Sequence, residues 1–262
     1  MPAQSDLRGQ VIAVAGATGV LGSTLARALW GRGASLILAG RSVDRLEALA
    51  SDLSGSLTVP GDLRHKVARR LLRKRAEEGG RLDGIFVSVG EADYHALTAL
   101  EDERIREVID ENLTLPALIV RSLLPALLRR KSGSIVLVAS EWGIEPAAGE
   151  VPYAAAKAGL IGFTRSLAAE LEPSGIRVNA LAPGAFESPM LSGLTERGRE
   201  ALLASYKGRL LDVRTIAAEA LRLLHPDTKE SGRVIPITGR PGPDDGRAPI
   251  PPPPTSPPAR TR

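Results

Sequence analysis

The stretch VIAVAGATGVLG, residues 11–22, decides the fold of this chain. Its first half is an aliphatic run of the length of one buried strand, and glycines follow at positions 16, 19 and 22, just before an amphipathic stretch at 23–32. A glycine-rich turn between a buried strand and a helix is typical of the start of a strand–helix–strand unit. The segment therefore predicts a parallel sheet with helices packed on it.

Six more short apolar runs follow, separated by longer amphipathic stretches. Besides 11–16, we expect strands at 35–40, 56–60, 84–90, 134–140, 176–182 and 233–238. Several runs are almost continuously apolar, which is typical of parallel strands covered by helices on both faces. The sequence thus predicts an α/β fold with a doubly wound, seven-stranded parallel sheet. A long helical stretch at 103–130 contains Pro116 and Pro125, which predict a bend or break there.

Composition excludes several classes of protein. The chain has 262 residues, of which 43% are hydrophobic and 24% charged, so it can bury a sizeable core. A net charge of +4 is too mild to indicate a nucleic-acid binder, and the basic run at 64–75 has the apolar spacing of a solvated helix face. The absence of cysteine excludes disulfides and thiolate metal sites, and we expect no metal. With a polar start and no long apolar run to cross a bilayer, we expect a soluble cytoplasmic protein without a membrane partner.

The C-terminal segment differs from the rest of the chain. Residues 241–262 are dense in proline and cannot form a packed core. We expect a folded domain over residues 1–240 and a disordered or polyproline II tail over 241–262. A proline-rich ligand for a partner domain is the alternative reading of this tail.

The strand ends carry residues suited to a dinucleotide. Gly16, Gly19 and Gly22 let the backbone approach a pyrophosphate at a helix N-terminus, although a tight turn without a ligand is the alternative. An acidic residue at the end of the second strand would bind the ribose of NAD(H), whereas Gly40 leaves space there and Arg41 offers a cation to a 2′-phosphate. NADP(H) is therefore favoured unless Arg41 is an ordinary surface arginine. Asp62, beside Leu63 at the end of the third strand, would contact adenine or equally cap the next helix.

The combination of GATGVLG, Asn112, Ser140, YAAAK at 153–157 and NALAPG resembles the short-chain dehydrogenase/reductase family over residues 7–239. The segments 153–171, 175–190 and 208–221 are most similar to its 3-oxoacyl-[acyl-carrier-protein] reductase branch. The resemblance implies a single-domain Rossmann fold and an NADP(H)-dependent oxidoreductase that interconverts a ketone, such as a 3-oxoacyl compound, and a secondary alcohol. It also implies a homodimer or homotetramer paired through the helices that carry Asn112 and Tyr153.

The spacing of Tyr153 and Lys157 suits this chemistry. Hydride transfer to a ketone builds negative charge on its oxygen, which needs a positioned proton donor. Residues four apart share a helix face, so we expect the Lys157 ammonium to lower the pKa of the Tyr153 phenol from its usual value of about 10. By resemblance, Lys157 also binds the nicotinamide ribose and relays a proton, Ser140 orients the substrate oxygen, and Asn112 holds a water of the relay. Further cofactor contacts implied by the resemblance are Thr18, Val20, Leu21, Gly90, Tyr153, Pro183, Gly184 and Ser188.

Two segments remain to be interpreted. Residues 187–212 predict a lid whose apolar residues line a substrate cleft or pack the lid onto the body. These residues are Met190, Leu191, Leu194, Leu202 and Leu203. The sequence VSVG at 87–90 replaces the Asn-Asn-Ala-Gly usual in the family, and Ser88 could supply only part of its hydrogen bonding. This departure leaves a non-catalytic dinucleotide-binding sensor or scaffold with the same fold as the alternative function.

Overall fold

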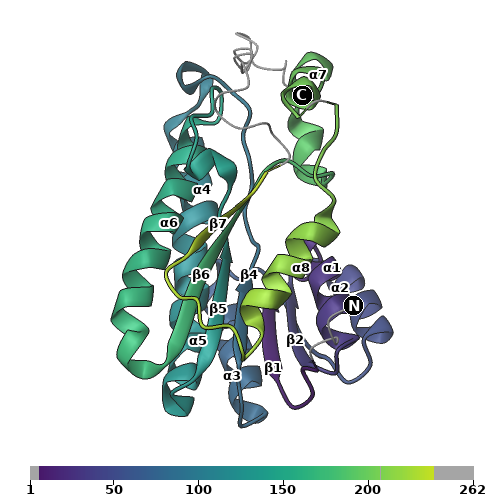
Figure 1. The fold of residues 1–262 in the computed structure, drawn as a ribbon. Helices are drawn as coiled ribbons and strands as arrows, with labels where there is room; N and C mark the ends of the chain where they lie inside the picture. The colour runs from purple at the N-terminus through teal and green to yellow at the C-terminus, as the bar shows by residue number, and fades with distance from the viewer. Residues whose placement is uncertain (1–5, 207, 239–262) are drawn as a thin grey trace.

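A computed structural model describes residues 6–206 and 208–238 (Figure 1). Seven parallel strands form one sheet in the order β3-β2-β1-β4-β5-β6-β7. Their bounds are Val11–Ala15 (β1), Ser35–Gly40 (β2), Leu57–Pro60 (β3), Gly84–Val87 (β4), Gly133–Val138 (β5), Ile176–Pro183 (β6) and Val234–Ile237 (β7). All the predicted strands are confirmed, but β4 and β5 end earlier than expected because the chain leaves the sheet there to form cleft walls. The predicted tail at 241–262 lies outside the described residues.

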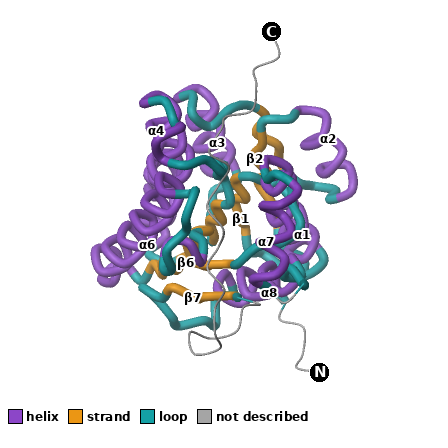
Figure 2. Tube along the Cα trace, turned by 90° about the horizontal axis from the view of Figure 1, so that it is seen from above, coloured by secondary structure: helices purple, strands orange, loops and turns teal. Residues whose placement is uncertain are grey.

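Two helical layers enclose the sheet, as the view from above shows (Figure 2). The α-helices are α1 (Val20–Trp30), α2 (Val43–Asp52), α3 (Lys66–Glu78), α4 (Asp102–Ile109), α5 (Leu115–Arg130), α6 (Val151–Leu171), α7 (Glu196–Ser205) and α8 (Val213–Leu224). Short 3₁₀ turns are η1 (Leu97–Ala99), η3 (Glu141–Gly143), η4 (Glu172–Ser174) and η5 (Pro189–Gly193), and η2 (Asp110–Thr114) is a π-helical turn. This is the doubly wound Rossmann architecture that the sequence predicts.

The core explains why the strands read as continuous apolar runs. Successive side chains of a strand point to opposite faces. In β1, Ala13 and Ala15 pack into a cluster with α3, α5 and α6, whereas Ile12 and Val14 pack into a second cluster with α1, α2 and α8. Both faces of the strand are therefore buried, and a polar side chain on either face would lose its hydration.

Two helix boundaries differ from the prediction. Helix α1 begins at Val20 rather than at residue 23, because Gly19 takes the extended N-cap conformation and the glycine motif itself forms the first turn. The stretch 103–130 is interrupted by the π-helical turn η2, just before Pro116 in the first turn of α5, where proline is tolerated. At Pro125, where the sequence predicts a bend or break, the helix is not broken, since α5 continues through it with Leu123 and Leu127 packed in the core.

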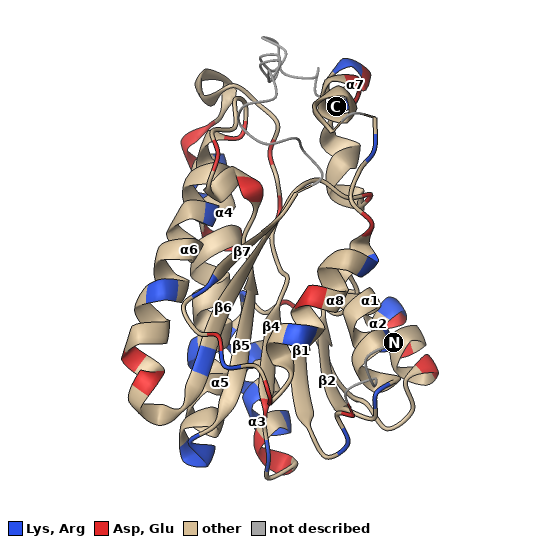
Figure 3. Cartoon of the chain, viewed as in Figure 1, with Lys and Arg blue, Asp and Glu red and all other residues tan. Residues whose placement is uncertain are grey.

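The basic run at 64–75 lies largely on α3 as a solvated face. Basic side chains are spread along this helix, and its acidic side chains lie together at its C-terminal end (Figure 3). Glu77 pairs with Arg73 at 2.9 Å, and Glu78 pairs with Lys74 and Arg75. These exposed pairs offset part of the positive charge of the helix. Val67, one of the residues whose apolar spacing predicts this helix, is exposed, whereas Ala68 and Leu72 are buried.

The expectation of no membrane-crossing stretch needs a correction. The helical stretch Asp102–Arg130 is long and apolar enough to cross a bilayer by length and composition, and 44% of its apolar window is buried inside the protein. Ile119, Leu123 and Leu127 from this stretch pack in the core under the sheet. Core packing therefore accounts for its apolar composition, and the stretch is weak evidence for a membrane.

Candidate active site

A cleft of about 600 Å³ lies at the carboxyl ends of the strands, where the sheet order reverses between β1 and β4. Ligands of open α/β sheets bind at this switch point. With the exception of Asn112, all the site residues that the sequence predicts line this cleft. They are Gly16, Thr18, Gly19, Val20, Leu21, Gly22, Arg41, Asp62, Leu63, Gly90, Ser140, Tyr153, Lys157, Pro183, Gly184 and Ser188.

The floor of the cleft is the glycine-rich turn between β1 and α1. A Cβ atom on Gly22 would overlap the Gly16 carbonyl oxygen and lie 2.9 Å from its carbonyl carbon. The first turn of α1 therefore packs directly on the turn that precedes it, and only glycine fits at this position. We call this turn, with Gly16, Gly19 and Gly22, the glycine cradle. No side chains project from these three glycines, so a pyrophosphate can approach the backbone N–H groups at the N-terminus of α1.

Cationic side chains line the end of the cleft beside β2. Arg41 follows the last residue of β2, and Arg45 lies on the first turn of α2, four residues further on. Sequence reasoning missed Arg45, although its spacing of one helical turn from Arg41 was a signal. The two guanidinium groups at this end of the cleft favour a ligand that is negatively charged where it lies beside Arg41 and Arg45.

Asp62 lies on the wall of the same end but does not cap a helix. Its carboxylate accepts hydrogen bonds from the backbone and guanidinium N–H groups of Arg64, which hold its pKa below the usual range. Helix α3 begins at Lys66 with His65 as its N-cap, so the predicted capping alternative is wrong. Arg64 also forms an ion pair with Glu111 at 3.0 Å, which links the loop after β3 to η2.

Tyr153 and Lys157 lie on the first turns of α6 and face the cleft. Lys157 Nζ is 5.5 Å from the centroid of the Tyr153 ring, and it donates a hydrogen bond to Val138 O at 3.0 Å. Both side chains are buried. The alanines between them, at 154–156, keep the helix regular and add no bulk at this point.

The electrostatics around this pair correct one sequence-based expectation. The pKa of Tyr153 is raised, not lowered, because the phenol is buried and the charges of Glu150 and Glu141 disfavour a phenolate. A hydrogen bond with Ser140 lowers it in part. Burial also lowers the pKa of Lys157 to about 8. The spacing correctly predicted that Tyr153 and Lys157 lie side by side. It did not predict that the carboxylates of Glu150 and Glu141 would lie near the phenol.

Ser140 and Asn112 occupy different positions relative to the cleft. Ser140 is buried at the end of the β5 segment, and its Oγ accepts a hydrogen bond from Trp142 N at 3.2 Å. Asn112 lies within η2, behind the cleft wall. Its Nδ2 donates to Glu91 O at 2.7 Å and Val108 O at 2.9 Å, and its Oδ1 accepts from Glu91 N. Asn112 therefore fixes the loop that follows β4.

The altered VSVG segment retains one link between central strands. Ser88 donates both its backbone N–H, at 3.0 Å, and its hydroxyl, at 3.3 Å, to Ala15 O at the end of β1. The single serine thus supplies part of the hydrogen bonding expected of the usual asparagines. A Cβ on Gly90 would lie 2.5 Å from Asn112 Oδ1 and 3.2 Å from Lys157 Nζ, so Asn112 and Lys157 approach each other behind this loop.

A buried tyrosine ties the lid to the loop after Ser140. Tyr206 ends the α7 segment, and its hydroxyl donates to the Glu141 carboxylate and accepts a hydrogen bond from Ala185 N at 2.8 Å. A Cβ on Gly184 would lie 2.6 Å from this hydroxyl, so glycine is required beside it. Sequence reasoning missed Tyr206 and Glu141, and the only signal was a rare tyrosine at the end of the predicted lid.

The lid forms one side of the substrate end of the cleft. Met190, Leu191 and Leu202 line it together with Trp142 and Tyr94. Leu194 and Leu203, which were also candidates, are not among the lining residues. The cleft thus joins a glycine cradle and cationic end to an apolar chamber around Tyr153, as a dinucleotide-dependent enzyme requires.

Comparison with known proteins defines the family. The model for short chain dehydrogenases matches residues 10–198. The chain is 31% identical to nodulation protein G of Rhizobium sp. (strain N33), with 89% of this chain and 97% of that protein covered. It is also 31% identical to the 3-oxoacyl-[acyl-carrier-protein] reductase FabG of Vibrio cholerae, with 89% and 98% covered. Among solved structures, levodione reductase has a TM-score of 0.82 and 29% identity, with 88% of this chain and 97% of that chain covered.

The chain belongs to the short-chain dehydrogenase/reductase family, and the similarity includes its 3-oxoacyl reductase-like branch. It is an oxidoreductase that acts on CH–OH groups, and members of this family bind NAD(P).

Proposed function

We propose that this protein is an NADPH-dependent ketone reductase in which Tyr153 donates the proton to the carbonyl oxygen. The observation that carries the proposal is the meeting of Tyr153, Lys157 and Ser140 in the cleft that also holds the glycine cradle. Structural roles alone do not require a buried phenol, a buried amine and a buried hydroxyl to face the same cavity.

The cofactor assignment follows the charges along the cleft. The glycine cradle holds the pyrophosphate, and Arg41 and Arg45 hold the 2′-phosphate of the adenosine ribose. Asp62 and Leu63 contact the adenine ring, while Pro183, Gly184 and Ser188 line the nicotinamide end. When bound, NADPH supplies a hydride to the carbonyl carbon.

The raised pKa of Tyr153 supports the reductive direction. Burial and the nearby carboxylates keep the phenol protonated at neutral pH, so Tyr153 begins the reaction as an acid. Ser140 orients the carbonyl oxygen towards the Tyr153 hydroxyl. Once Tyr153 has given up its proton, the same environment favours its rapid reprotonation.

Lys157 is suited to return that proton. Its pKa of about 8 lies close to neutral pH, so the ammonium can release a proton and regain one from water. Asn112 acts as a positioning residue, because it fixes the loop at Gly90 and Glu91 against which Lys157 lies. Through this loop, Asn112 keeps the path from Lys157 towards solvent in place.

The substrate end supports a ketone with an apolar portion. Met190, Leu191 and Leu202 of the lid and Trp142 offer apolar contacts beside Tyr153. The similarity to 3-oxoacyl-[acyl-carrier-protein] reductases makes a 3-oxoacyl thioester the first candidate substrate.

We further propose a cytoplasmic homodimer or homotetramer, with residues 1–240 as the catalytic domain. Exposed apolar side chains on the two long helices support the pairing, since Leu128 of α5 and Val151 of α6 are 40% and 45% exposed. Light scattering after size exclusion tests it, and a mass near 27.6 kDa, that of one chain, would contradict the proposal.

Following NADPH oxidation with a panel of ketones tests the proposed reaction. The panel contains a 3-oxoacyl thioester, a cyclic diketone and simple alkanones, each offered to the wild type and to Tyr153→Phe. We expect at least one ketone to give a rate that depends on Tyr153. A complete absence of such a rate would favour the non-catalytic dinucleotide-binding alternative.

A further inference from the structure

A second cavity of about 730 Å³ lies at the end of the sheet opposite the cleft. Its walls come from the amino ends of the strands, since Asp83 precedes β4, Ser132 precedes β5, Arg177 lies near the start of β6 and Ser231 precedes β7. The C-terminal half of α6 closes one side. A space of this size is large enough for a small organic ligand.

The walls of this cavity carry more positive than negative groups. Four cationic side chains line it, against two carboxylates, Asp83 and Glu172. The cationic side chains are Arg130, Arg165, Arg177 and Lys229. Asp83 contributes little free negative charge, because its carboxylate pairs with Arg130 at 2.9 Å and Arg81 at 2.6 Å and accepts a hydrogen bond from Val11 N. Glu172 lies on the exposed rim.

Arg177 is the central group. Its guanidinium donates to Leu223 O at 2.8 Å and His225 O at 3.0 Å, and so caps the end of α8. These bonds leave further N–H groups of the guanidinium available. Among the described residues Arg177 has no carboxylate partner, and its half-buried position lowers its pKa. A half-buried cation without a counter-ion is unfavourable unless an anion joins it.

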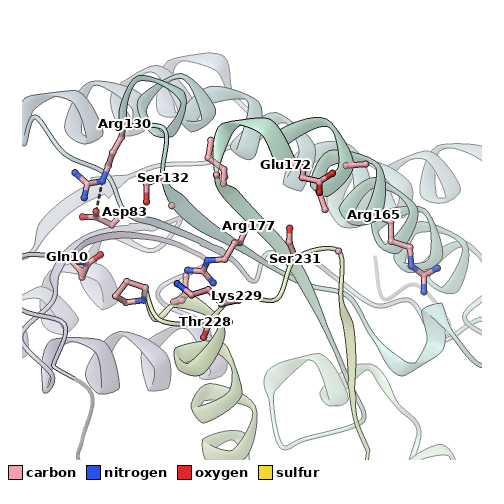
Figure 4. Close-up of a pocket in the computed structure, with 18 residues that line it drawn as sticks. Gln10, Asp83, Arg130, Ser132, Arg165, Glu172, Arg177, Thr228, Lys229 and Ser231 are labelled. Atoms are coloured by element: carbon pink, nitrogen blue, oxygen red, sulfur yellow. Dashed lines mark ion pairs between the residues drawn. The ribbon is translucent and has the colours of Figure 1, made fainter.

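Lys229 and Ser231 complete a set of donors around Arg177. In Figure 4 these three side chains lie in the middle of the view, between the Arg130–Asp83 pair and Arg165. Lys229 forms no ion pair with a described residue. The Ser231 hydroxyl accepts a hydrogen bond from Val178 N at 3.1 Å, so its own hydrogen can be donated to a ligand.

We propose that this cavity binds the phosphate group of a small phosphorylated molecule, with Arg177, Lys229 and Ser231 as its donors. A guanidinium, an ammonium and a hydroxyl together match the several acceptor oxygens of a phosphate better than the two of a carboxylate. The site is separate from the cleft, because its residues belong to the opposite ends of the strands. The proposal does not depend on the reaction proposed above.

Thermal unfolding of the full-length protein with added anion tests this site. The probes are inorganic phosphate and glycerol 3-phosphate at constant ionic strength, and the two distinguish free phosphate from a phosphate ester. We expect concentration-dependent stabilisation of the wild type, because a ligand that binds only the folded state raises its Tm. No shift with either probe would overturn the proposal.

Variants locate the site. Lys229→Glu alters an exposed side chain and should weaken the apparent affinity at least about tenfold, the effect of losing one charge-assisted hydrogen bond. Arg177→Gln should do the same, and Lys229→Glu decides the matter if Arg177→Gln fails to fold. Lys74→Glu, on the exposed face of α3, makes the same change of charge as Lys229→Glu, so it is the matched control and should keep the wild-type response.

Two further outcomes would contradict the proposal. Arg41→Ala removes a cation of the cleft, so a phosphate response that this variant abolishes would belong to the cleft instead. Lys229→Glu could also change the mass of the assembly in light scattering while its response to phosphate stays at the wild-type level. In that case the cationic side chains of the cavity pair with a carboxylate of a second copy of the chain rather than with a phosphate.

Discussion

Replacing Lys157 by methionine should change how the stability of the apoprotein depends on pH. Lys157 is almost fully buried, and burial lowers its pKa from the usual 10.5 to about 8. The unfolded chain therefore binds more protons than the folded one between these values. The wild type gains stability as the pH rises through this window, and below it the buried ammonium costs about 3 kcal/mol.

Methionine has a similar length and no charge, so Lys157→Met lacks this pH dependence. It also leaves Val138 O without its donor, a loss of about 1–3 kcal/mol that does not vary with pH. Between about pH 7 and pH 9.5 the stability of the wild type relative to Lys157→Met should rise by about 2 kcal/mol. Urea unfolding of both proteins at the two pH values measures this difference. If the stability difference between the wild type and Lys157→Met stays constant or falls with pH, burial does not lower the pKa of the Lys157 amine to about 8.

Three substitutions examine other parts of the site. Gly22→Ala should destabilise the protein by about 1–3 kcal/mol in urea unfolding and weaken NADPH binding, because the added Cβ overlaps the Gly16 carbonyl. The control Gly79→Ala adds a Cβ with only an ordinary contact at 3.8 Å, and its stability should stay within about 0.5 kcal/mol of the wild type. Arg41→Ala should weaken NADPH at least about tenfold and leave NADH unchanged in fluorescence titrations, and an equal loss for both would oppose the 2′-phosphate assignment. Tyr206→Phe should lower stability by about 1–3 kcal/mol and raise KM, since Ala185 N and Glu141 lose the hydroxyl that joins them; an unchanged melting curve would argue against this link.

The sequence predicted the fold because both faces of the central strands are buried. A short continuous apolar run such as that of β1, followed directly by glycines, is typical of a strand covered on both sides. The close turn from β1 into α1 requires those glycines. The pair of Tyr153 and Lys157 was equally predictable, because helical spacing fixes which residues share a face.

Features that depend on distant segments could not be predicted. The raised pKa of Tyr153 comes first from burial of the phenol and then from the charges of Glu150 and Glu141, and both effects depend on how the loop between β5 and α6 folds around the ring. The link from Tyr206 to Glu141 joins residues that are 65 positions apart. The π-helical turn around Asn112 was also missed, since prolines mark where a helix can break but not the geometry of the interruption.

The most direct test of the account is the turnover of Tyr153→Phe with the best ketone found for the wild type, measured alongside its affinity for NADPH. The loss of one hydroxyl should lower kcat by at least about a hundredfold and leave the NADPH dissociation constant within about twofold, because the hydroxyl is needed for proton transfer and is only one of many contacts with the cofactor. Turnover by Tyr153→Phe at the wild-type rate would contradict the assignment of Tyr153 as the proton donor.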